Sequence, residues 1–394
     1  MRRQNNKVSI RKLLTRNVEE IIGREELERR LESGRPLRVK FGIDPTAREL
    51  HLGNAVVLWK LREFQELGHR VIFVIGDFTA QIGDPSGRLE ARGVLRPEEI
   101  RRHWRTYQKQ AGKIIDWSRA EVRRNSAWYR RMKLEEFFGL LKHFTTKQIL
   151  ERDMFQEREK KNLPIWLSEF LYPLLQGYDS VALHADVEVG GSDQLFNMLR
   201  GRDLGALYRQ SPQVVLTTPL LLGLDGRKMS KSYENTIGIS ESPAEQFGKV
   251  MSISDELMPQ YFALATRLQN PEISNILRAH PAAAKARLAE EIVELYHGRA
   301  AARKARDEFR RVFQKKEMPR TLPNRVVSKI SQPILDLLVR AKLAPSKSEA
   351  RRLVEQGAVA IDGEVVKEWQ MSVAPVSGMV LKVGKRRFAK LKVQ

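Results

Sequence analysis

The stretch LRVKFGIDPTARELHLGNAVVLWKLREFQELGHRVIFVI, residues 37–75, decides the fold class. Residues 37–43 and 71–75 are apolar runs typical of strands, and the second has the composition of a fully buried one. Between them Val57, Leu61 and Phe64 recur at helical spacing, and the helix is expected to stop at Gly68. A strand, a helix and a strand in this order predict a βαβ unit, hence a parallel sheet with a right-handed crossover.

The rest of the chain extends this pattern and adds smaller parts. Further strands are expected in 184–191 and 213–223, with a short helix between them, and residues 97–180 are expected to be mostly helical. We therefore predict an α/β, Rossmann-like domain with a parallel sheet over residues 1–240, with a helical insertion at about 97–165. A helical domain at 241–317, a proline-containing linker at 318–332 and a small α+β unit at 333–394, with a hairpin turn at 362–363, complete the predicted organisation.

The charge of the chain favours a polyanionic partner. The 394 residues contain 70 Lys and Arg against 48 Asp and Glu, a net charge of +22, and residues 333–394 alone contain 12 against 6. Nucleic acid is the commonest such partner, although a general basic bias or a charge-rich surface would give the same numbers. The absence of cysteine excludes disulfides, thiolate metal sites and cysteine nucleophiles, and fits a reducing cytoplasm. No apolar run is long enough to span a membrane, and the basic start lacks the apolar core of a secretory signal.

The start of the predicted helix, HLGN at 51–54, has the properties of an anion site. A helix amino terminus presents unpaired N–H groups and a positive dipole, and His51 adds a donor there. Gly53 removes a side chain, so that a flat ring can lie close to the backbone. Alone, a histidine and a glycine at a helix start are more often plain capping residues.

A cationic stretch, GLDGRKMSKSYENTIG at 223–238, contains Arg227, Lys228 and Lys231. Alone, this stretch would be interpreted as a solvated lysine-rich loop. Both stretches, however, follow strands of the same predicted sheet, so both would overhang the carboxyl ends of the strands, where ligands bind. Together they could clamp a triphosphate. The seven histidines show no metal-ligand spacing, and the chain contains no GxSxG, Walker or GxGxxG motif, so phosphate binding is assigned to this pair.

Several ordered motifs resemble a known family. DPTARELHLGN and KMSKS resemble the two signatures of class I aminoacyl-tRNA synthetases, and GDFTAQIGDPSGR, LYPLLQGYDS, VGGSDQLFN and SPQVVLTTPLLLGLDGRKMSKS are similar to bacterial-type tyrosyl-tRNA synthetases. The tail resembles an RNA-binding module of a small-subunit ribosomal protein. The resemblance implies that L-tyrosine is activated with ATP to tyrosyl-adenylate and pyrophosphate, and is then transferred to the 3′-terminal ribose of tRNA(Tyr). It also implies Mg²⁺ accompanying ATP, no tightly bound metal or organic cofactor, a cytoplasmic location, and a homodimer with the insertion as a possible contact.

The resemblance also assigns residues to roles. The catalytic set is Thr46, His51, Asn54, Arg88, Arg92, Lys228 and Lys231. The ATP-binding set is Gly42, Asp44, His51, Gly53, Gly191, Asp193, Lys228, Met229, Ser230, Lys231 and Ser232. The tyrosine-binding set is Asp84, Tyr172, Gln176, Asp179 and Gln194, with Asp179 accepting the phenol proton. The tRNA-binding set is Lys347, Arg351, Arg352, Lys385, Arg386 and Arg387. Independently of the resemblance, the i, i+4, i+7 spacing of Tyr172, Gln176 and Asp179 puts three polar groups on one helical face.

Two departures from the family pattern leave alternatives open. Asn54 stands where the signature has its second histidine, and Lys40 stands where one branch of the family has a phenol-binding tyrosine. The donor that replaces this tyrosine is left open, with Asn125 as a candidate helper. A synthetase of the same class for another aromatic amino acid, tryptophan first, and a catalytically silent RNA-binding relative are the competing interpretations. Asp179 is an argument against the first, and the intact KMSKS, His51 and Asp84 are arguments against the second.

Overall fold

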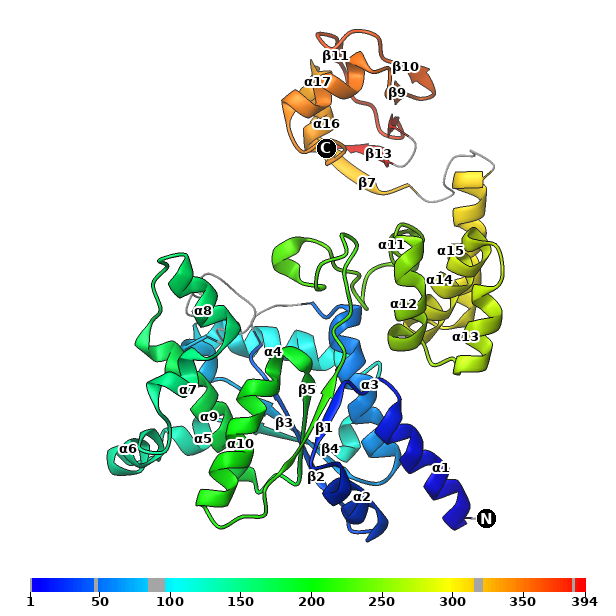
Figure 1. The fold of residues 1–394 in the computed structure, drawn as a ribbon. Coiled ribbons are helices and arrows are strands. Elements are labelled where there is room, and N and C mark those ends of the chain that lie inside the picture. The colour runs from blue at the N-terminus through cyan, green and yellow to red at the C-terminus, as the bar shows by residue number, and fades with distance from the viewer. Residues whose placement is uncertain (1, 46–48, 84–95, 315–321, 385–386) are drawn as a thin grey trace. The chain divides into compact units, whose positions relative to one another are not determined.

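The computed structural model describes residues 2–45, 49–83, 96–314, 322–384 and 387–394. The chain forms two compact units, Met1–Arg303 and Lys304–Gln394. Their elements are shown in Figure 1.

The larger unit is built on a six-stranded sheet with the order β1-β6-β5-β2-β3-β4. Its strands are β1 (Glu20–Ile22), β2 (Arg38–Ile43), β3 (Arg70–Ile75), β4 (Ala120–Arg124), β5 (Val187–Gly191) and β6 (Val214–Thr218). All neighbouring pairs are parallel except β1 with β6, which is antiparallel. The predicted α/β class with a parallel sheet is confirmed.

The βαβ unit predicted from residues 37–75 is present. Strands β2 and β3 pair in register from Arg38↔Arg70 to Ile43↔Ile75, and α3 (Leu52–Glu66) connects them. The apolar side of α3 is buried, which accounts for the helical spacing seen in the sequence. Gly68 follows the helix with φ of +86°, a left-handed conformation that favours glycine and ends the helix as expected.

The order of the strands creates a crevice at the edge of the sheet. From β2 the chain continues through α3 to β3, on the side of the sheet that ends in β4. From β5 it continues through α10 (Leu195–Leu207) to β6, on the other side of the sheet. Crossovers between parallel strands are right-handed as a rule, and α3 and α10 accordingly lie on opposite faces of the sheet (Figure 1). The neighbouring carboxyl ends of β2 and β5 form the point where the strand order reverses. Ligands of open α/β sheets bind at this kind of point.

One strand was missed in the region predicted to be mostly helical. β4 pairs with β3 in parallel, with Val71↔Ala120 and Ile75↔Arg124 as the outer pairs. It is an edge strand whose last three residues are exposed, so the charged sequence AEVRR lacks the apolar run that identified the other strands. The rest of this region is helical, in α4 (Pro97–Ala111), α5 (Ser126–Tyr129), α6 (Leu134–Leu141), α7 (Thr146–Leu150), α8 (Asp153–Lys160) and α9 (Leu167–Leu183).

The remaining α-helices of the chain before residue 310 either precede β2 or follow β6 in the sequence. Two precede β2, namely α1 (Arg2–Thr15) and α2 (Arg24–Glu32). The region predicted to be helical from 241 onwards contains α11 (Pro243–Met251), α12 (Met258–Ala265), α13 (Asn270–Leu277), α14 (Pro281–His297) and α15 (Arg299–Phe309).

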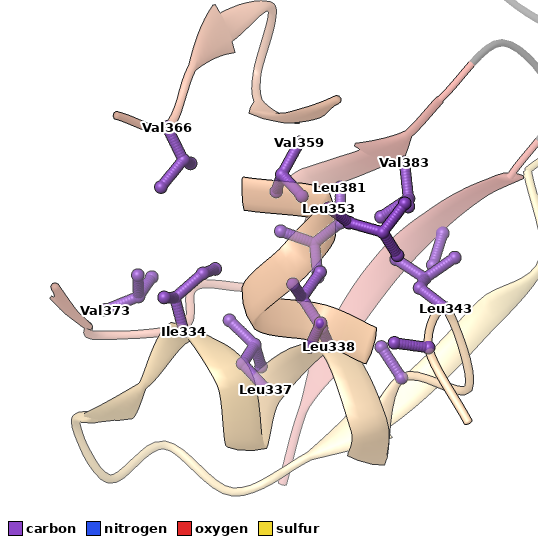
Figure 2. Packing of buried hydrophobic residues seen from close by; sticks show 14 of the residues in the cluster. Ile334, Leu337, Leu338, Leu343, Leu353, Val359, Val366, Val373, Leu381 and Val383 are labelled. Carbon is purple, nitrogen blue, oxygen red and sulfur yellow. The ribbon is translucent and has the colours of Figure 1, made fainter. Parts of the chain in front are cut away.

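From residue 322 onwards, the described part of the C-terminal unit combines the helices α16 and α17 with a five-stranded sheet of order β10-β9-β12-β13-β7. Its elements are β7 (Asn324–Val327), β8 (Gln332–Pro333), α16 (Ile334–Arg340), α17 (Lys347–Glu355), β9 (Val359–Ile361), β10 (Glu364–Val365), β11 (Ser372–Val373), β12 (Val380–Val383) and β13 (Arg387–Val393). The hairpin turn predicted between β9 and β10 is present, with φ of 46° at Asp362 and 95° at Gly363. Figure 2 shows the core of this unit, in which Leu337, Leu353 and Leu381 are buried together.

Candidate active site

A cavity of about 280 Å³ opens at the carboxyl ends of β2, β3, β5 and β6. It lies at the crevice expected from the strand order. The residues that line it come from these strand ends, the first turn of α3, the middle of α9 and the lysine-containing loop after β6. Those predicted from the sequence are Gly42, Asp44, His51, Gly53, Asn54, Tyr172, Gln176, Asp179, Gly191, Asp193, Gln194, Lys228 and Met229.

The other predicted residues do not line this cavity or cannot be placed. Ser230, Lys231 and Ser232 continue the lysine-containing loop next to Met229. Thr46, Asp84, Arg88, Arg92, Lys385 and Arg386 lie outside the described residues.

The first turn of α3 is capped by the asparagine that replaces the signature histidine. His51 is the N-cap residue, with an extended backbone, and its N–H donates to Oδ1 of Asn54 at 3.1 Å. The Nδ1 atom of His51 is buried and has no hydrogen-bond partner among the described residues. Burial, followed by the charges of Lys231 and Lys228, lowers the pKa of His51 to about 4. The imidazole is therefore neutral at pH 7.

The lysine-containing loop is joined directly to this helix start. The backbone N–H of Leu52 donates to the carbonyl of Ile237 at 2.9 Å, and the N–H of Ile239 donates to the carbonyl of Leu50 at 3.0 Å. His51 and Gly238 form a β-bridge between these two bonds. The start of α3 and the lysine-containing loop, far apart in the sequence, therefore meet at one place, as expected from the positions of their motifs after strands of one sheet.

Both lysines of the loop face acids that lie outside it. The Nζ atom of Lys228 is 2.6 Å from Oδ2 of Asp193, and Nζ of Lys231 is 3.9 Å from Oε2 of Glu49. Asp225, inside the loop, instead accepts from Arg227. The cationic side of the cavity thus includes an ion pair between two residues predicted to bind ATP.

Asn235 holds the loop together and was not identified from the sequence. This buried side chain donates to Oδ1 of Asp225 at 2.6 Å and to the carbonyl of Lys228 at 3.1 Å, and accepts from the N–H of Ser230 at 2.8 Å. A Cβ atom at Gly223 would lie 2.3 Å from the Asn235 side chain, so the glycine is needed for this packing. No sequence motif marked Asn235, because its role depends on contacts between the two arms of the loop.

The opposite side of the cavity carries a network of side chains around Asp44. The hydroxyl of Tyr172 donates to Oδ2 of Asp44 at 3.0 Å, and the hydroxyl of Thr79 donates to Oδ1 at 2.9 Å. A Cβ atom at Gly76 would lie 1.9 Å from Oδ1 of Asp44, so glycine is required there. Thr79 was not predicted from the sequence, although it lines the cavity.

Asp179 lies deep in the same cavity and receives three hydrogen bonds. The hydroxyl of Tyr129 donates at 2.7 Å, Nε1 of Trp128 at 2.9 Å and Nδ2 of Asn125 at 3.4 Å. Burial raises the pKa of Asp179 to about 6, against the opposing effects of Lys40 and of these three donors. Asn125 is thus in contact with Asp179, whereas Trp128 and Tyr129 were missed because aromatic residues on a short helix are usually core residues.

Lys40 is buried behind the cavity and pairs with Glu188. Its Nζ atom lies 3.0 Å from Oε1 of Glu188 and donates to the carbonyl of Gln176 and to Oγ of Ser180, both at 2.8 Å. An ammonium group has three N–H bonds, and these three acceptors use all of them. Lys40 is therefore not the donor that replaces the phenol-binding tyrosine.

The predicted RNA-binding residues are found on and near α17. Lys347 pairs with Asp336 at 2.6 Å and Arg352 with Glu349 at 2.7 Å, and both cations are largely exposed. Arg351 lies over the ring of Trp369, 4.3 Å from its centre. Arg387 donates to the carbonyl of Leu343 at 2.7 Å. These exposed cations can contact phosphates, whereas Phe388 is buried.

Two classes of site receive no support from the described part of the chain. None of its helices is both long and apolar enough to cross a lipid bilayer. Within the same residues, no three His, Asp or Glu side chains are grouped so that they could hold a metal ion.

Comparison with known proteins agrees with this geometry. Residues 32–314 match the family of class I tRNA synthetases for tryptophan and tyrosine, and residues 332–373 match the S4 domain. A tyrosine–tRNA ligase of Thermotoga maritima is 49% identical over 389 residues, covering 96% of either chain. One of Moorella thermoacetica is 49% identical and covers 96% of this chain and 95% of its own.

A solved structure is similar as well. The tyrosyl-tRNA synthetase of Archaeoglobus fulgidus, solved with L-tyrosine, superposes with a TM-score of 0.62 at 26% identity, covering 76% of this chain and 99% of that one. On these matches, the chain belongs to the class I tRNA synthetases of the tryptophan and tyrosine family and carries an S4 domain at its C-terminal end.

Proposed function

We propose that this chain is a tyrosine–tRNA ligase, which activates L-tyrosine with ATP and transfers the tyrosyl group to the 3′-terminal ribose of tRNA(Tyr). The observation that carries the proposal is the convergence of the α3 start, the lysine-containing loop and the polar face of α9 on one cavity. The names of the relatives at 49% identity support the choice of tyrosine.

Activation requires groups that stabilise negative charge. A carboxylate oxygen of tyrosine attacks the α-phosphorus of ATP, and the bond to the β-phosphate oxygen breaks as pyrophosphate leaves. The neutral His51 donates a hydrogen bond to the phosphates, and Lys228 and Lys231 place positive charge beside the leaving pyrophosphate. Asn54 keeps its NH₂ group for a phosphate, because its carbonyl oxygen is used by the helix cap. Thr46, Arg88 and Arg92 complete this set by resemblance. No protein nucleophile is needed.

The ATP side also contains a contact that has to change during binding. Asp193 binds the ribose in this proposal, yet its carboxylate is paired with Lys228 in the free protein. Ribose hydroxyls at Asp193 would compete with the lysine, so that Lys228 becomes available to the phosphates. Gly42, Gly53 and Gly191 allow the nucleotide to approach the backbone, and Met229, Ser230 and Ser232 carry the lysines.

The tyrosine side rests on the face of α9. Tyr172, Gln176 and Gln194, with Asp84 by resemblance, bind the amino and carboxylate groups, and Asp179 accepts the phenol O–H at the end of the cavity. A phenylalanine side chain could not donate this bond, so one acceptor position of the buried Asp179 carboxylate, beyond those used by Asn125, Trp128 and Tyr129, would stay unfilled. The phenol is therefore recognised by its hydrogen bond rather than by ring size.

The partners follow from the same assignment. Mg²⁺ enters with ATP, bound by phosphates and water rather than by a dedicated set of side chains. The unit at 333–394 contributes Lys347, Arg351, Arg352 and the segment 385–387 to tRNA phosphates. We also propose a homodimer formed through the insertion at about 97–165, a cytoplasmic location, and the domain division at 240, 317 and 332.

Amino-acid-dependent exchange of pyrophosphate into ATP, measured with each of the twenty amino acids, tests the proposal. We expect exchange with tyrosine. Exchange with tryptophan alone would support the other specificity of the family, and exchange with none would support a catalytically silent RNA-binding protein. Lys228→Ala should reduce the tyrosine-dependent rate by at least about tenfold, the effect of losing one charged hydrogen bond. Lys304→Ala, at an exposed lysine of α15 outside the proposed dimer contact, is the matched control and should leave the rate unchanged.

A further inference from the structure

A buried ion pair lies directly behind the tyrosine side of the cavity. Lys40 of β2 and Glu188 of β5 face each other in the register of the sheet, and their side chains are 0% and 1% exposed. Neither residue lines the cavity. The three N–H bonds of Lys40 are occupied by protein acceptors, so this pair can act on a substrate only through the residues that it holds.

The pair holds one turn of α9 from two sides. Lys40 donates to the carbonyl of Gln176 and the hydroxyl of Ser180, both at 2.8 Å. Glu188 accepts from Nε2 of Gln176 at 3.2 Å and from Oγ of Ser180 at 3.0 Å. Asp179 lies within this turn, and both Gln176 and Asp179 line the cavity.

α9 lacks one of its own hydrogen bonds just before this turn. Pro173 lies inside α9 and has no N–H group, so the carbonyl of Glu169 lacks its usual helical partner. The 176–180 turn itself remains helical, and the bonds to Lys40 and Glu188 fix it to the sheet.

Lys40 also provides positive charge close to Asp179. The groups that face the Asp179 carboxyl are Tyr129, Trp128 and Asn125 from the segment at 125–129, and Lys40, with its partner Glu188, from the sheet. Burial raises the pKa of Asp179 to about 6, and Lys40 opposes this rise. An ionised Asp179 is the better acceptor for a phenol O–H.

Resting on the tyrosine activation proposed above, we propose that Lys40, paired with Glu188, is a positioning residue that determines amino-acid specificity. It holds the 176–180 turn of α9 in place and keeps Asp179 ionised as the acceptor of the substrate phenol. It does so without touching the substrate. The place of a phenol-binding tyrosine is thus taken by a lysine that acts through Asp179.

The test removes both charges together, because a single substitution would leave an unpaired buried charge and could unfold the protein. The variant is Lys40→Met/Glu188→Gln. The matched control is Lys60→Met/Glu63→Gln on α3, a second buried pair with a separation of 2.7 Å, whose lysine also donates to two further protein oxygens, the carbonyls of Leu13 and Arg16. Neither control residue lines the cavity.

Exchange with tyrosine and with phenylalanine is measured from pH 5 to 9 for both variants, together with thermal unfolding. In the Lys40/Glu188 variant, kcat/KM for tyrosine relative to phenylalanine should fall at least about tenfold, mainly through KM for tyrosine. The acidic limb of the tyrosine profile should move upwards by up to about one pH unit, because the loss of the Lys40 charge raises the pKa of Asp179 and the loss of the Glu188 charge offsets only part of this rise. The control should keep the preference and the profile of the unmodified protein.

An unchanged preference and profile in the folded Lys40/Glu188 variant would overturn the proposal, since a purely structural pair would lower all rates alike. If that variant does not fold, Lys40→Gln/Glu188→Gln keeps hydrogen-bonding groups without charge. The absence of the pH shift in that folded variant would overturn the proposal equally. Failure of the unmodified protein to use tyrosine would instead contradict the proposed function itself.

Discussion

Binding of ATP should raise the pKa of His51. In the free protein its pKa is lowered to about 4 by burial and by Lys231 and Lys228, and among the described residues its buried Nδ1 atom has no hydrogen-bond partner. The triphosphate brings negative charge to the start of α3 and draws both lysines towards itself. Both effects favour the charged imidazole, so the pKa of His51 should rise when nucleotide binds.

The magnitude follows from the lowered pKa. A shift from the ordinary 6.5 to about 4 corresponds to at most about 3 kcal/mol, and solvent that reaches the partly exposed ring reduces this value. The unfolded chain binds this proton below pH 6.5, whereas the folded protein binds it only near pH 4. The stability contribution of a neutral His51 is therefore complete above pH 6.5 and is lost progressively as the pH falls from 6.5 to 4.

Nuclear magnetic resonance titration of the seven histidines provides the assay, with His51→Gln to assign the signal. We expect one histidine to titrate near pH 4 and to move upwards when a non-hydrolysable ATP analogue is added. Lys228→Ala/Lys231→Ala should raise the pKa in the free protein but leave it below 6.5, because burial is the largest cause. A His51 pKa near 6.5 in the free protein, or a His51 pKa that does not change when nucleotide binds, would refute this reasoning.

Three further substitutions test other parts of the site. Asp179→Ala should reduce the preference for tyrosine over phenylalanine by roughly 10- to 100-fold, because it removes one hydrogen bond to a charged group. If the preference is retained in the exchange assay, the phenol is recognised elsewhere. Asn235→Ala removes the hydrogen bonds that join the two arms of the lysine-containing loop. It should therefore lower kcat for activation at nearly unchanged KM for tyrosine, and lower the free energy of unfolding by about 1–3 kcal/mol. Asn275→Ala on the exposed side of α13 serves as its control, and equal kinetics for the two would contradict the role of Asn235. Gly76→Ala should destabilise the protein by about 1–3 kcal/mol and displace Asp44. Gly139→Ala, inside α6 with open space around it, should instead stabilise the protein by up to about 1 kcal/mol in thermal unfolding.

Those parts of the fold that are determined by interactions between neighbouring residues could be predicted from the sequence. The helical spacing between 52 and 66, the left-handed Gly68 and the turn at 362–363 are each determined by neighbouring residues, and all three are present in the structure. The edge strand β4 was missed because only one of its sides meets the sheet, so its sequence is charged and lacks an apolar run.

The candidate site also has a part that could be predicted from the sequence and a part that could not. His51 and Lys228 could be brought together from sequence because parallel strands end at the same edge of a sheet, and motifs that follow those strands must meet there. The bonds of Asp179 to Trp128 and Tyr129 could not be predicted, because they join a short helix in the insertion to the distant α9. The partner of Lys40 was equally hidden, since its pairing with Glu188 depends on which strands become neighbours in the sheet.

A double-mutant cycle on activation tests most directly whether the start of α3 and the lysine-containing loop act on one nucleotide. His51→Ala, Lys228→Ala and the double variant are compared by single-turnover formation of tyrosyl-adenylate at pH 8, where His51 is neutral. The ion-pair partner of Lys228 is Asp193, and His51 carries no charge at pH 8, so coupling that is present in activation but absent from the stability of the ATP-free protein is assigned to the bound phosphates. We predict a coupling energy of at least about 0.5 kcal/mol in activation and additive effects on the stability of the ATP-free protein. Effects on activation that add within about 0.3 kcal/mol would contradict the shared site.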